Sequence, residues 1–272
     1  MNIQITNGRV IDPASATDKT VDLFITDGRI AAIGSPPAGF KAERIIDATG
    51  CVVCPGLVDL SARLREPGFE YKATLESEMA AAAAGGVTSL ACPPDTDPPL
   101  DEPGLVEMLK HRARLPQFAH VYPVGALTDK LEGKRLTEMA ELTEAGCIAF
   151  SQANMPVRDT QVLLRAMQYA ATFGFPVWLS AQDPHLARDG VAHDGEVASR
   201  LGLTGIPVVA ETIAIATLLH LVRETGVRLH LQRISSAAGL EMVSAARAAG
   251  IAVTCDVSIN HLHLSDMDIG YF

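Results

Sequence analysis

Polar side chains stand at the ends of the predicted strands, where catalytic groups would be placed. Ser61 and Arg63 lie two residues apart at the end of the apolar segment 51–60. Residues two apart in a strand share a face, so a His-x-His pair here could direct both imidazoles toward one metal ion. A serine hydroxyl is a weak metal ligand, and arginine carries five donors, no lone pair and a permanent charge. We therefore predict no metal at this pair.

Three later strand ends carry polar residues of a similar kind. The sequence reads Ser-Gln-Ala-Asn at 151–154, Ser-Ala-Gln-Asp at 180–183 and Gln-Arg-Ile-Ser at 232–235. None of the three supplies a histidine, and Asp183 is their only carboxylate. The strand ends thus hold hydrogen-bonding groups and a second arginine, Arg233, and they offer no readable Ser-His-Asp arrangement.

The eight histidines do not replace the absent ligands in an obvious way. His230 is three residues from Arg233, which predicts that it lies on the opposite face of the strand. His261 and His263 follow the last predicted strand and could reach the same end, although we interpret them first as loop or cap residues. Asp59 shares a face with Ser61 and is interpreted as a hydrogen-bonding residue.

Two kinds of segment must position these side chains. Residues 1–50 read as short strands with turns at Asn7-Gly8 and Asp27-Gly28, which predicts a small β-domain. From residue 51 onward, apolar strands alternate with helical segments. The predicted strands are 51–60, 87–92, 119–125, 147–151, 176–180, 227–235 and 251–257. The predicted helices are 72–84, 101–114, 135–145, 159–173, 209–225 and 236–249.

This alternation favours an α/β fold, specifically a (β/α)8 barrel over 51–272, with the functional groups at the C-terminal ends of its strands. Only seven strand-helix units can be counted. An open barrel would expose strand edges and apolar surface. We therefore expect that the natural polypeptide is longer or that a partner covers the gap.

Composition narrows the class of protein further. The 272 residues carry a formal net charge of −10 and are 48% hydrophobic. This balance predicts a sizeable core and argues against nucleic acid or an anionic membrane as partner. Five cysteines, mostly in apolar segments, indicate reduced thiols in a cytoplasmic protein. We expect neither a signal peptide nor a membrane span.

Three long segments carry a resemblance to a known family. They are PGLVDLSARLREPGFEYKATLESEMAAAAAGGVTSLACPPDTDP at 55–98, HDGEVASRLGLTGIPVVAE at 193–211 and VTCDVSINHLHLSDMD at 253–268. Each closely resembles class I dihydroorotases, the cyclic amidohydrolases of pyrimidine synthesis. The resemblance implies a barrel with a small β-sandwich domain, to which residues 1–50 would contribute.

The same resemblance implies that the metal site is degenerate. The family's two paired metal histidines fall on Ser61 and Arg63, and its bridging acid falls on Gln152 and Ala153. Two further metal histidines fall on Ser180 and Arg233. Of the vestigial substrate pocket, the arginine is retained as Arg65 and the asparagine is replaced by Asp95. His261 remains near the mouth of the barrel, which is the end formed by the C-terminal ends of the strands.

The resemblance therefore implies a pseudoenzyme with no catalytic residues, no metal and no cofactor. It also implies a partner, the catalytic chain of aspartate transcarbamoylase, which inactive dihydroorotase-like chains help to assemble in some bacteria. Homo-oligomers are expected as well. Two alternatives stay open: a sensor that binds an anionic metabolite in the emptied pocket, and a metal-independent hydrolase or lyase that uses His261, Asp183 and Arg65.

Overall fold

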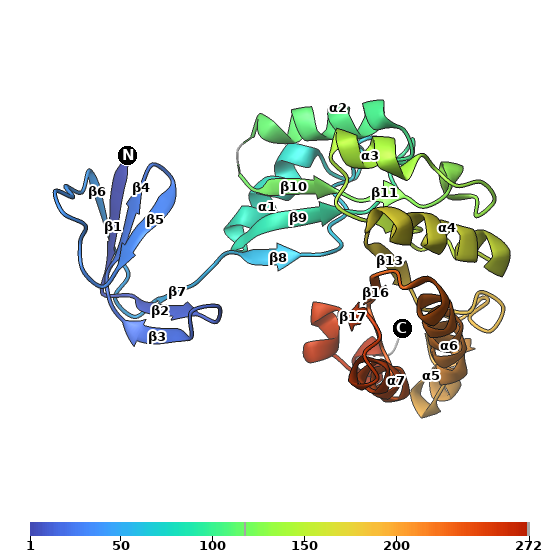
Figure 1. Cartoon of the computed structure of the whole chain (residues 1–272). Coiled ribbons are helices and arrows are strands. Elements are labelled where there is room, and N and C mark those ends of the chain that lie inside the picture. Colours follow the sequence, from blue (N-terminus) through green and yellow to red (C-terminus); the bar gives the residue numbers. More distant parts are fainter. Residues whose placement is uncertain (117, 271–272) are drawn as a thin grey trace. The chain divides into compact units, whose positions relative to one another are not determined.

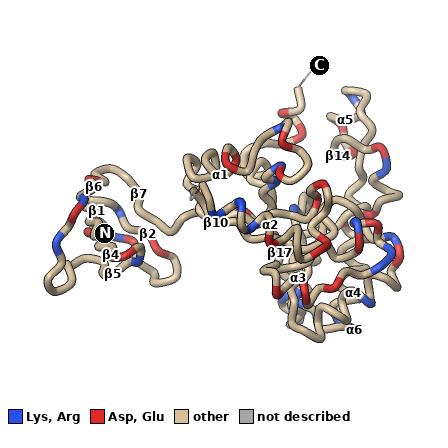
Figure 2. Tube along the Cα trace, turned by 90° about the horizontal axis from the view of Figure 1, so that it is seen from above, with Lys and Arg blue, Asp and Glu red and all other residues tan. Residues whose placement is uncertain are grey.

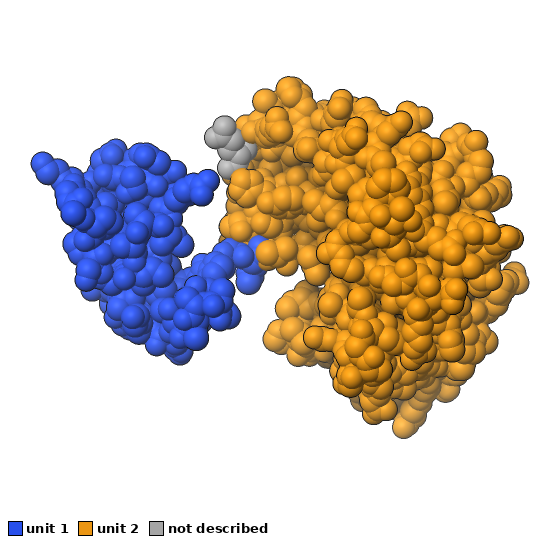
Figure 3. Space-filling view, viewed as in Figure 1, with its two compact units in different colours: residues 1–57 blue, residues 58–272 orange. Residues whose placement is uncertain are grey.

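The computed structural model describes residues 1–116 and 118–270 and divides into two compact units, Met1–Leu57 and Val58–Phe272 (Figures 1 and 3). The boundary drawn from the sequence lay at residue 50. The structure places 51–57 with the first unit, because β7 (Val52–Val53) pairs with β2 (Arg9–Asp12) there.

The first unit consists of two small sheets. One has the order β5-β4-β1-β6, formed by β1 (Asn2–Thr6), β4 (Leu23–Thr26), β5 (Arg29–Ile33) and β6 (Arg44–Asp47). The other has the order β3-β2-β7, with β3 at Thr17–Thr20. Asp27 and Gly28 join β4 to β5 with φ of 51° and 74°, the left-handed pair that a tight hairpin turn requires. The predicted hairpin turn is present.

The second unit contains a parallel sheet in barrel order. Its strands are β8 (Leu57–Asp59), β9 (Val87–Cys92), β10 (His120–Pro123), β11 (Gly125–Ala126), β12 (Phe150–Ser151), β13 (Val177–Ser180), β16 (Leu229–Gln232) and β17 (Val253–Cys255). Hydrogen bonding gives the orders β8-β9-β10 and β11-β12-β13-β16-β17. Only Val124 separates β10 from β11, so they form one interrupted strand and the sheet has the seven positions expected from the sequence.

Helices follow the strands as a (β/α) barrel requires (Figure 1). They are α1 (Leu75–Ala84), α2 (Pro103–Arg114), α3 (Met139–Ala145), α4 (Thr160–Phe173), α5 (Glu196–Leu201), α6 (Val208–Thr225) and α7 (Ala237–Ala248). Side-chain caps explain several starts: Asp159 accepts from the backbone N–H groups of Gln161 and Val162, and Ser236 accepts from that of Gly239. Each predicted helix is present within a few residues.

Alternation along the strands separates two layers. Leu179, Leu229 and Leu231 are buried against the helices in the main core. Their neighbours Trp178 and His230 occupy the other face of the sheet, with ring centroids 5.5 Å apart. The candidate site lies at the C-terminal ends of these strands, as in other (β/α) barrels.

Two sequence expectations need correction. The apolar segment 51–60 is not one strand: Pro55 and Gly56 separate β7 from β8, because proline lacks the N–H that a sheet needs. The segment 181–207 contains a short sheet, β14 (Ala192–His193) with β15 (Gly205–Ile206), around α5, none of which was predicted. In the described part of the chain, no helix combines the length and hydropathy needed to cross a membrane.

Candidate functional site at the strand ends

The first cationic group of the mouth is Arg63, which follows β8. Its Nε donates to Asp95 Oδ2 at 2.7 Å, and both side chains are about one quarter exposed, at 25% and 27%. Ser61 lies two residues earlier, where its backbone N–H donates to Asp59 Oδ1 at 2.8 Å. Asp95 is thus an ion-pair partner of Arg63, which gives this acidic residue a role that the sequence comparison did not predict.

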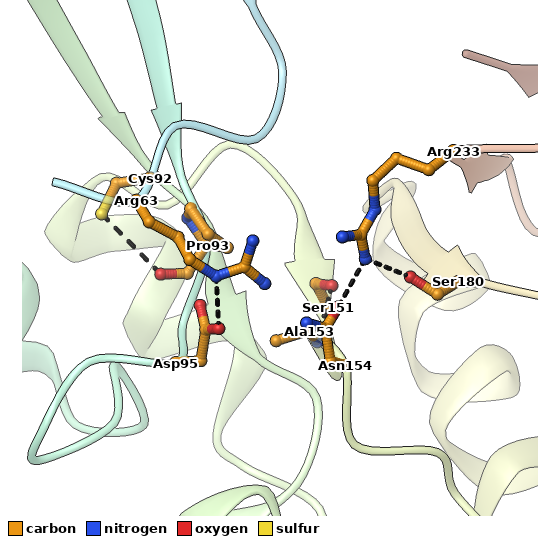
Figure 4. Close-up of polar contacts among 9 residues, drawn as sticks. All are labelled: Arg63, Cys92, Pro93, Asp95, Ser151, Ala153, Asn154, Ser180 and Arg233. Atoms are coloured by element: carbon orange, nitrogen blue, oxygen red, sulfur yellow. Dashed lines mark hydrogen bonds and ion pairs between the residues drawn. The ribbon is translucent and has the colours of Figure 1, made fainter. Parts of the chain in front are cut away.

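The second cationic group is Arg233, which follows β16. Its NH2 group donates to Ser180 Oγ at 2.9 Å and to Asn154 Oδ1 (Figure 4). Ser180 is the last residue of β13 and Asn154 follows β12, so one guanidinium connects three neighbouring strand ends. Among the sequence-predicted residues, the structure therefore brings Ser180 and Arg233 into direct contact.

The guanidinium of Arg233 is partly removed from water. Its Nε is buried and lacks a hydrogen-bond partner among the described residues. A buried donor left unpaired costs about 1–3 kcal/mol. Burial lowers the pKa of Arg233, and the nearby positive charge of Arg63 lowers this pKa further. The group remains a cation at neutral pH, but it is one with unused hydrogen-bonding capacity.

Asp256 fixes the backbone of Arg233. Its Oδ1 accepts the Arg233 backbone N–H at 2.5 Å, and its Oδ2 lies 3.1 Å from His230 Nε2. His230 Nδ1 lies 2.8 Å from Thr254 Oγ1. Burial acts to raise the pKa of Asp256, but the hydrogen bonds from His230 and Arg233 outweigh it and hold that pKa below its usual range.

The contact of His230 with Asp256 was not predicted, because a straight strand through Arg233 would place His230 on the opposite face. In the structure β16 ends at Gln232, and Arg233 has a φ of 57°. The left-handed residue interrupts the regular strand, and Asp256 contacts His230 through its ring but Arg233 through its backbone N–H. A signal in the sequence that could have indicated this contact is the expected pairing of the two adjacent parallel strands, which places His230 opposite Thr254.

The first two residues after β12, Gln152 and Ala153, are buried and engaged in structural contacts. Gln152 is 2% exposed, and both polar atoms of its side-chain amide lie within 3.0 Å of Thr128 Oγ1. Ala153 has a φ of 50°, and its backbone N–H donates to Ser151 Oγ at 3.0 Å. Where a bridging acid is expected from the family, an amide stabilises a loop.

The remaining predicted residues lie in two separate cavities. Arg65 lines a cavity of about 110 Å³ together with Arg63, Lys72 and Asp95. Asp183 and His261 line a larger groove of about 1290 Å³, which also includes Arg233.

Asp183 accepts the backbone N–H groups of His185 and Leu186, each at 2.9 Å. The bond from Leu186, followed by that from His185, outweighs the smaller effect of burial and lowers the pKa of Asp183. A carboxylate with a lowered pKa is a weak general base. Arg65 lines a different cavity from Asp183 and His261, so these three residues of the metal-independent alternative are not brought together in one cavity.

The donor set at the mouth does not fit a divalent metal. Arg63 and Arg233 contribute positive charge and N–H donors, Ser180 Oγ already accepts from Arg233, and Gln152 is turned to Thr128. The nearby thiol of Cys92 is buried, which raises its pKa to about 12, and it donates to the carbonyl of Pro93 at 3.7 Å. Within 1–116 and 118–270, no group of three or more His, Cys, Asp or Glu residues is arranged to hold a metal ion.

Similarity to known proteins places this site in a family. A family model described as dihydro-orotase-like matches residues 50–238. The chain is 50% identical over 266 residues to a dihydroorotase-like protein of Pseudomonas aeruginosa, covering 98% of this chain and 63% of the relative. It is 43% identical to a dihydroorotase of Syntrophotalea carbinolica, covering 98% of this chain and 62% of the relative.

Solved structures show the same fold. An L-hydantoinase from Arthrobacter aurescens is 24% identical with a TM-score of 0.80, covering 98% of this chain and 60% of that one. The chain spans less than two thirds of the length of the curated relatives it matches, between 62% and 64% for these and a dihydroorotase-like protein of Pseudomonas putida. By its sequence, the chain belongs to the dihydroorotase-like family.

Proposed function

We propose that this chain is a non-catalytic member of the family and serves as a structural subunit that assembles aspartate transcarbamoylase for pyrimidine biosynthesis. The observation that supports the loss of catalysis is the place of Arg233 between Ser180 and Asn154 at the mouth. The positive charge of a divalent ion would be repelled by the two nearby guanidiniums. The side chains of Arg233, Ser180 and Asn154 are not strong metal ligands. Metal-dependent hydrolysis needs an ion to activate water and polarise the amide carbonyl.

The assembly role is supported by a difference in resemblance to the family: the residues at the mouth have diverged, whereas two longer segments of the chain have not. The segments 65–92 and 193–211 still resemble working family members, whereas the strand-end residues Ser61, Arg63 and Arg233 do not. Relatives at 50% and 48% identity are called dihydroorotase-like proteins, in contrast to the dihydroorotases at 43% and below. A stable complex needs about 800 Å² of surface from each partner. A barrel of this size can present such a surface without using its mouth.

Co-expression with the catalytic chain of aspartate transcarbamoylase from the same organism tests the assembly role. We expect a larger complex by light scattering and a higher transcarbamoylase activity per catalytic chain than when that chain is expressed alone. The matched control is this chain with Ser61→His and Arg63→His, which alters the mouth and should support assembly equally well. Transcarbamoylase of unchanged size and activity in the presence of this chain would contradict the proposal.

A separate assay tests the loss of catalysis. The isolated chain, with and without added zinc, is expected to show no interconversion of dihydroorotate and carbamoyl aspartate above the background rate. Measurable turnover that disappears with a chelator would overturn the pseudoenzyme proposal. Such turnover would not affect the assembly role, which the co-expression experiment tests separately.

A further inference from the structure

Two guanidiniums face the space at the mouth from different strand ends. Figure 4 shows Arg63 extending from one side and Arg233 from the other, with Asn154 and Ser180 beside Arg233. The bond from Arg63 to Asp95 uses Nε, and the bonds from Arg233 to its neighbours use NH2. The terminal nitrogens of Arg63 and the NH1 group of Arg233 are therefore left for a ligand.

Hydrogen bonds to acidic side chains hold both arginines in place. Asp95 anchors Arg63, and Asp256 accepts the backbone N–H of Arg233. The loop after Arg233 is fixed as well, because Glu211 accepts the backbone N–H groups of Ser235 and Ser236 at 2.8 and 2.9 Å. Side chains that are ordered before binding lose less entropy when a ligand arrives.

We propose that Arg63 and Arg233 together bind the phosphate group of a small molecule, in the space where the family's metal chemistry would take place. Arg63 lines the smaller cavity and Arg233 the larger groove, so the ligand would bridge the two. The positive charge of Arg63 lowers the pKa of Arg233, an effect that an anion bound to both would offset. Guanidinium groups bind oxyanions through paired N–H donors. A carboxylate presents its two oxygens on one side, whereas phosphate presents oxygens toward all corners of a tetrahedron. Donors that approach from opposite sides therefore favour phosphate. This site is independent of the proposed partner.

Calorimetric titration with inorganic phosphate tests the proposal, at an ionic strength held constant with sodium chloride. We expect saturable binding at one site per chain and much weaker binding of acetate. Arg63→Gln and Arg233→Gln should each weaken phosphate binding by about tenfold or more. Arg200→Gln is the matched control, since Arg200 is an exposed residue of α5, and this variant should bind like the wild type.

A second titration uses glycerol 3-phosphate to separate the two sources of the group. Tighter binding of the ester indicates a phosphorylated metabolite, and tighter binding of inorganic phosphate indicates the free ion; either result supports the site. Should a glutamine variant fail to fold, Arg233→Lys keeps the charge and removes the fork of donors, and we expect the same loss. Phosphate binding that is absent, equal to that of acetate, or unchanged in these variants would overturn the proposal.

Discussion

At the residue scale, Arg233 changes what the neighbouring side chains do. Ser180 and Asn154 accept hydrogen bonds from its guanidinium, and Asp256 accepts from its backbone. A metal centre would need lone pairs at these positions, but the mouth presents donors instead. The electrostatic character of the site is therefore the reverse of what a hydrolytic metal centre requires.

The Asp256 carboxylate gives a pH-dependent prediction. Its pKa is lowered in the folded chain, so its stabilising effect is present above the pKa of the unfolded state and is lost as pH falls through the folded pKa. We expect Asp256→Asn to lower the free energy of unfolding at pH 7 by about 1–2 kcal/mol, a value reduced because the carboxylate is only partly buried. The difference from wild type should hold down to about pH 5 and shrink as the pH is lowered further toward about 2, as measured by urea unfolding.

Asp189→Asn is the control for this measurement. Asp189 forms an exposed ion pair with Arg188, with side chains 79% and 82% exposed, and such pairs contribute little to stability. Its φ of 58° also suits asparagine. A pH-independent effect of Asp256→Asn, or one equal to that of the control, would show that the bonds from His230 and Arg233 do not stabilise the carboxylate.

Single residues of the site were only partly predictable from the sequence. Ser180 and Arg233 could be assigned to strand ends, since apolar strands followed by polar residues mark those ends clearly. Their contact, and the pairing of Arg63 with Asp95, could not be predicted because both depend on neighbouring strands that are far apart in sequence. The contact of His230 with Asp256 was also not predictable, because it joins two neighbouring strands that are 26 residues apart in sequence.

At the element scale, α6 and α7 are connected by a buried carboxylate. Glu211 of α6 is 9% exposed, and its Oε1 accepts from the backbone N–H and the Oγ of Ser235 at 2.8 and 2.9 Å. Its Oε2 accepts from the backbone N–H of Ser236 at 2.9 Å and from its hydroxyl. One side chain thus holds the loop that links Arg233 to α7 and satisfies donors at the start of that helix.

We expect Glu211→Gln to destabilise the chain by about 1–3 kcal/mol, because an amide NH2 would face two of the donors that the carboxylate now accepts. Urea unfolding at pH 7 measures the change. Glu224→Gln on the same helix is the control: Glu224 is exposed, and its replacement should change stability by no more than about 0.5 kcal/mol. Equal stability of the two variants would refute the role of Glu211.

The elements themselves were more predictable than their ends. Helices with strong caps began close to the expected residue, as α4 and α7 did after Asp159 and Ser236. The helix expected at 135–145 begins only at Met139, because Thr137 is used to bond the Ala126 carbonyl. With six residues, α5 is too short for its periodicity to be distinguished from a loop.

At the scale of the whole molecule, charge is spread rather than concentrated. Figure 2 shows Lys and Arg residues interspersed with Asp and Glu along the described part of the trace, and the net charge is −10. Such interspersed charges differ from the clustered Lys and Arg residues that mark nucleic-acid-binding proteins. The local pair of arginines at the mouth is therefore set in a chain whose overall charge has the opposite sign.

The stability of the whole chain should not depend on a divalent metal. A metal bound only by the folded state stabilises it, so its removal lowers the melting temperature. Because the mouth presents cations and donors, we expect no stoichiometric zinc after dialysis and the same melting temperature with and without EDTA. The variant with Ser61→His and Arg63→His should behave in the same way, since Arg233 still donates to Ser180 beside the introduced pair. About one zinc per wild-type chain, lost to EDTA together with a fall in melting temperature, would show that the arginines move aside to admit a metal.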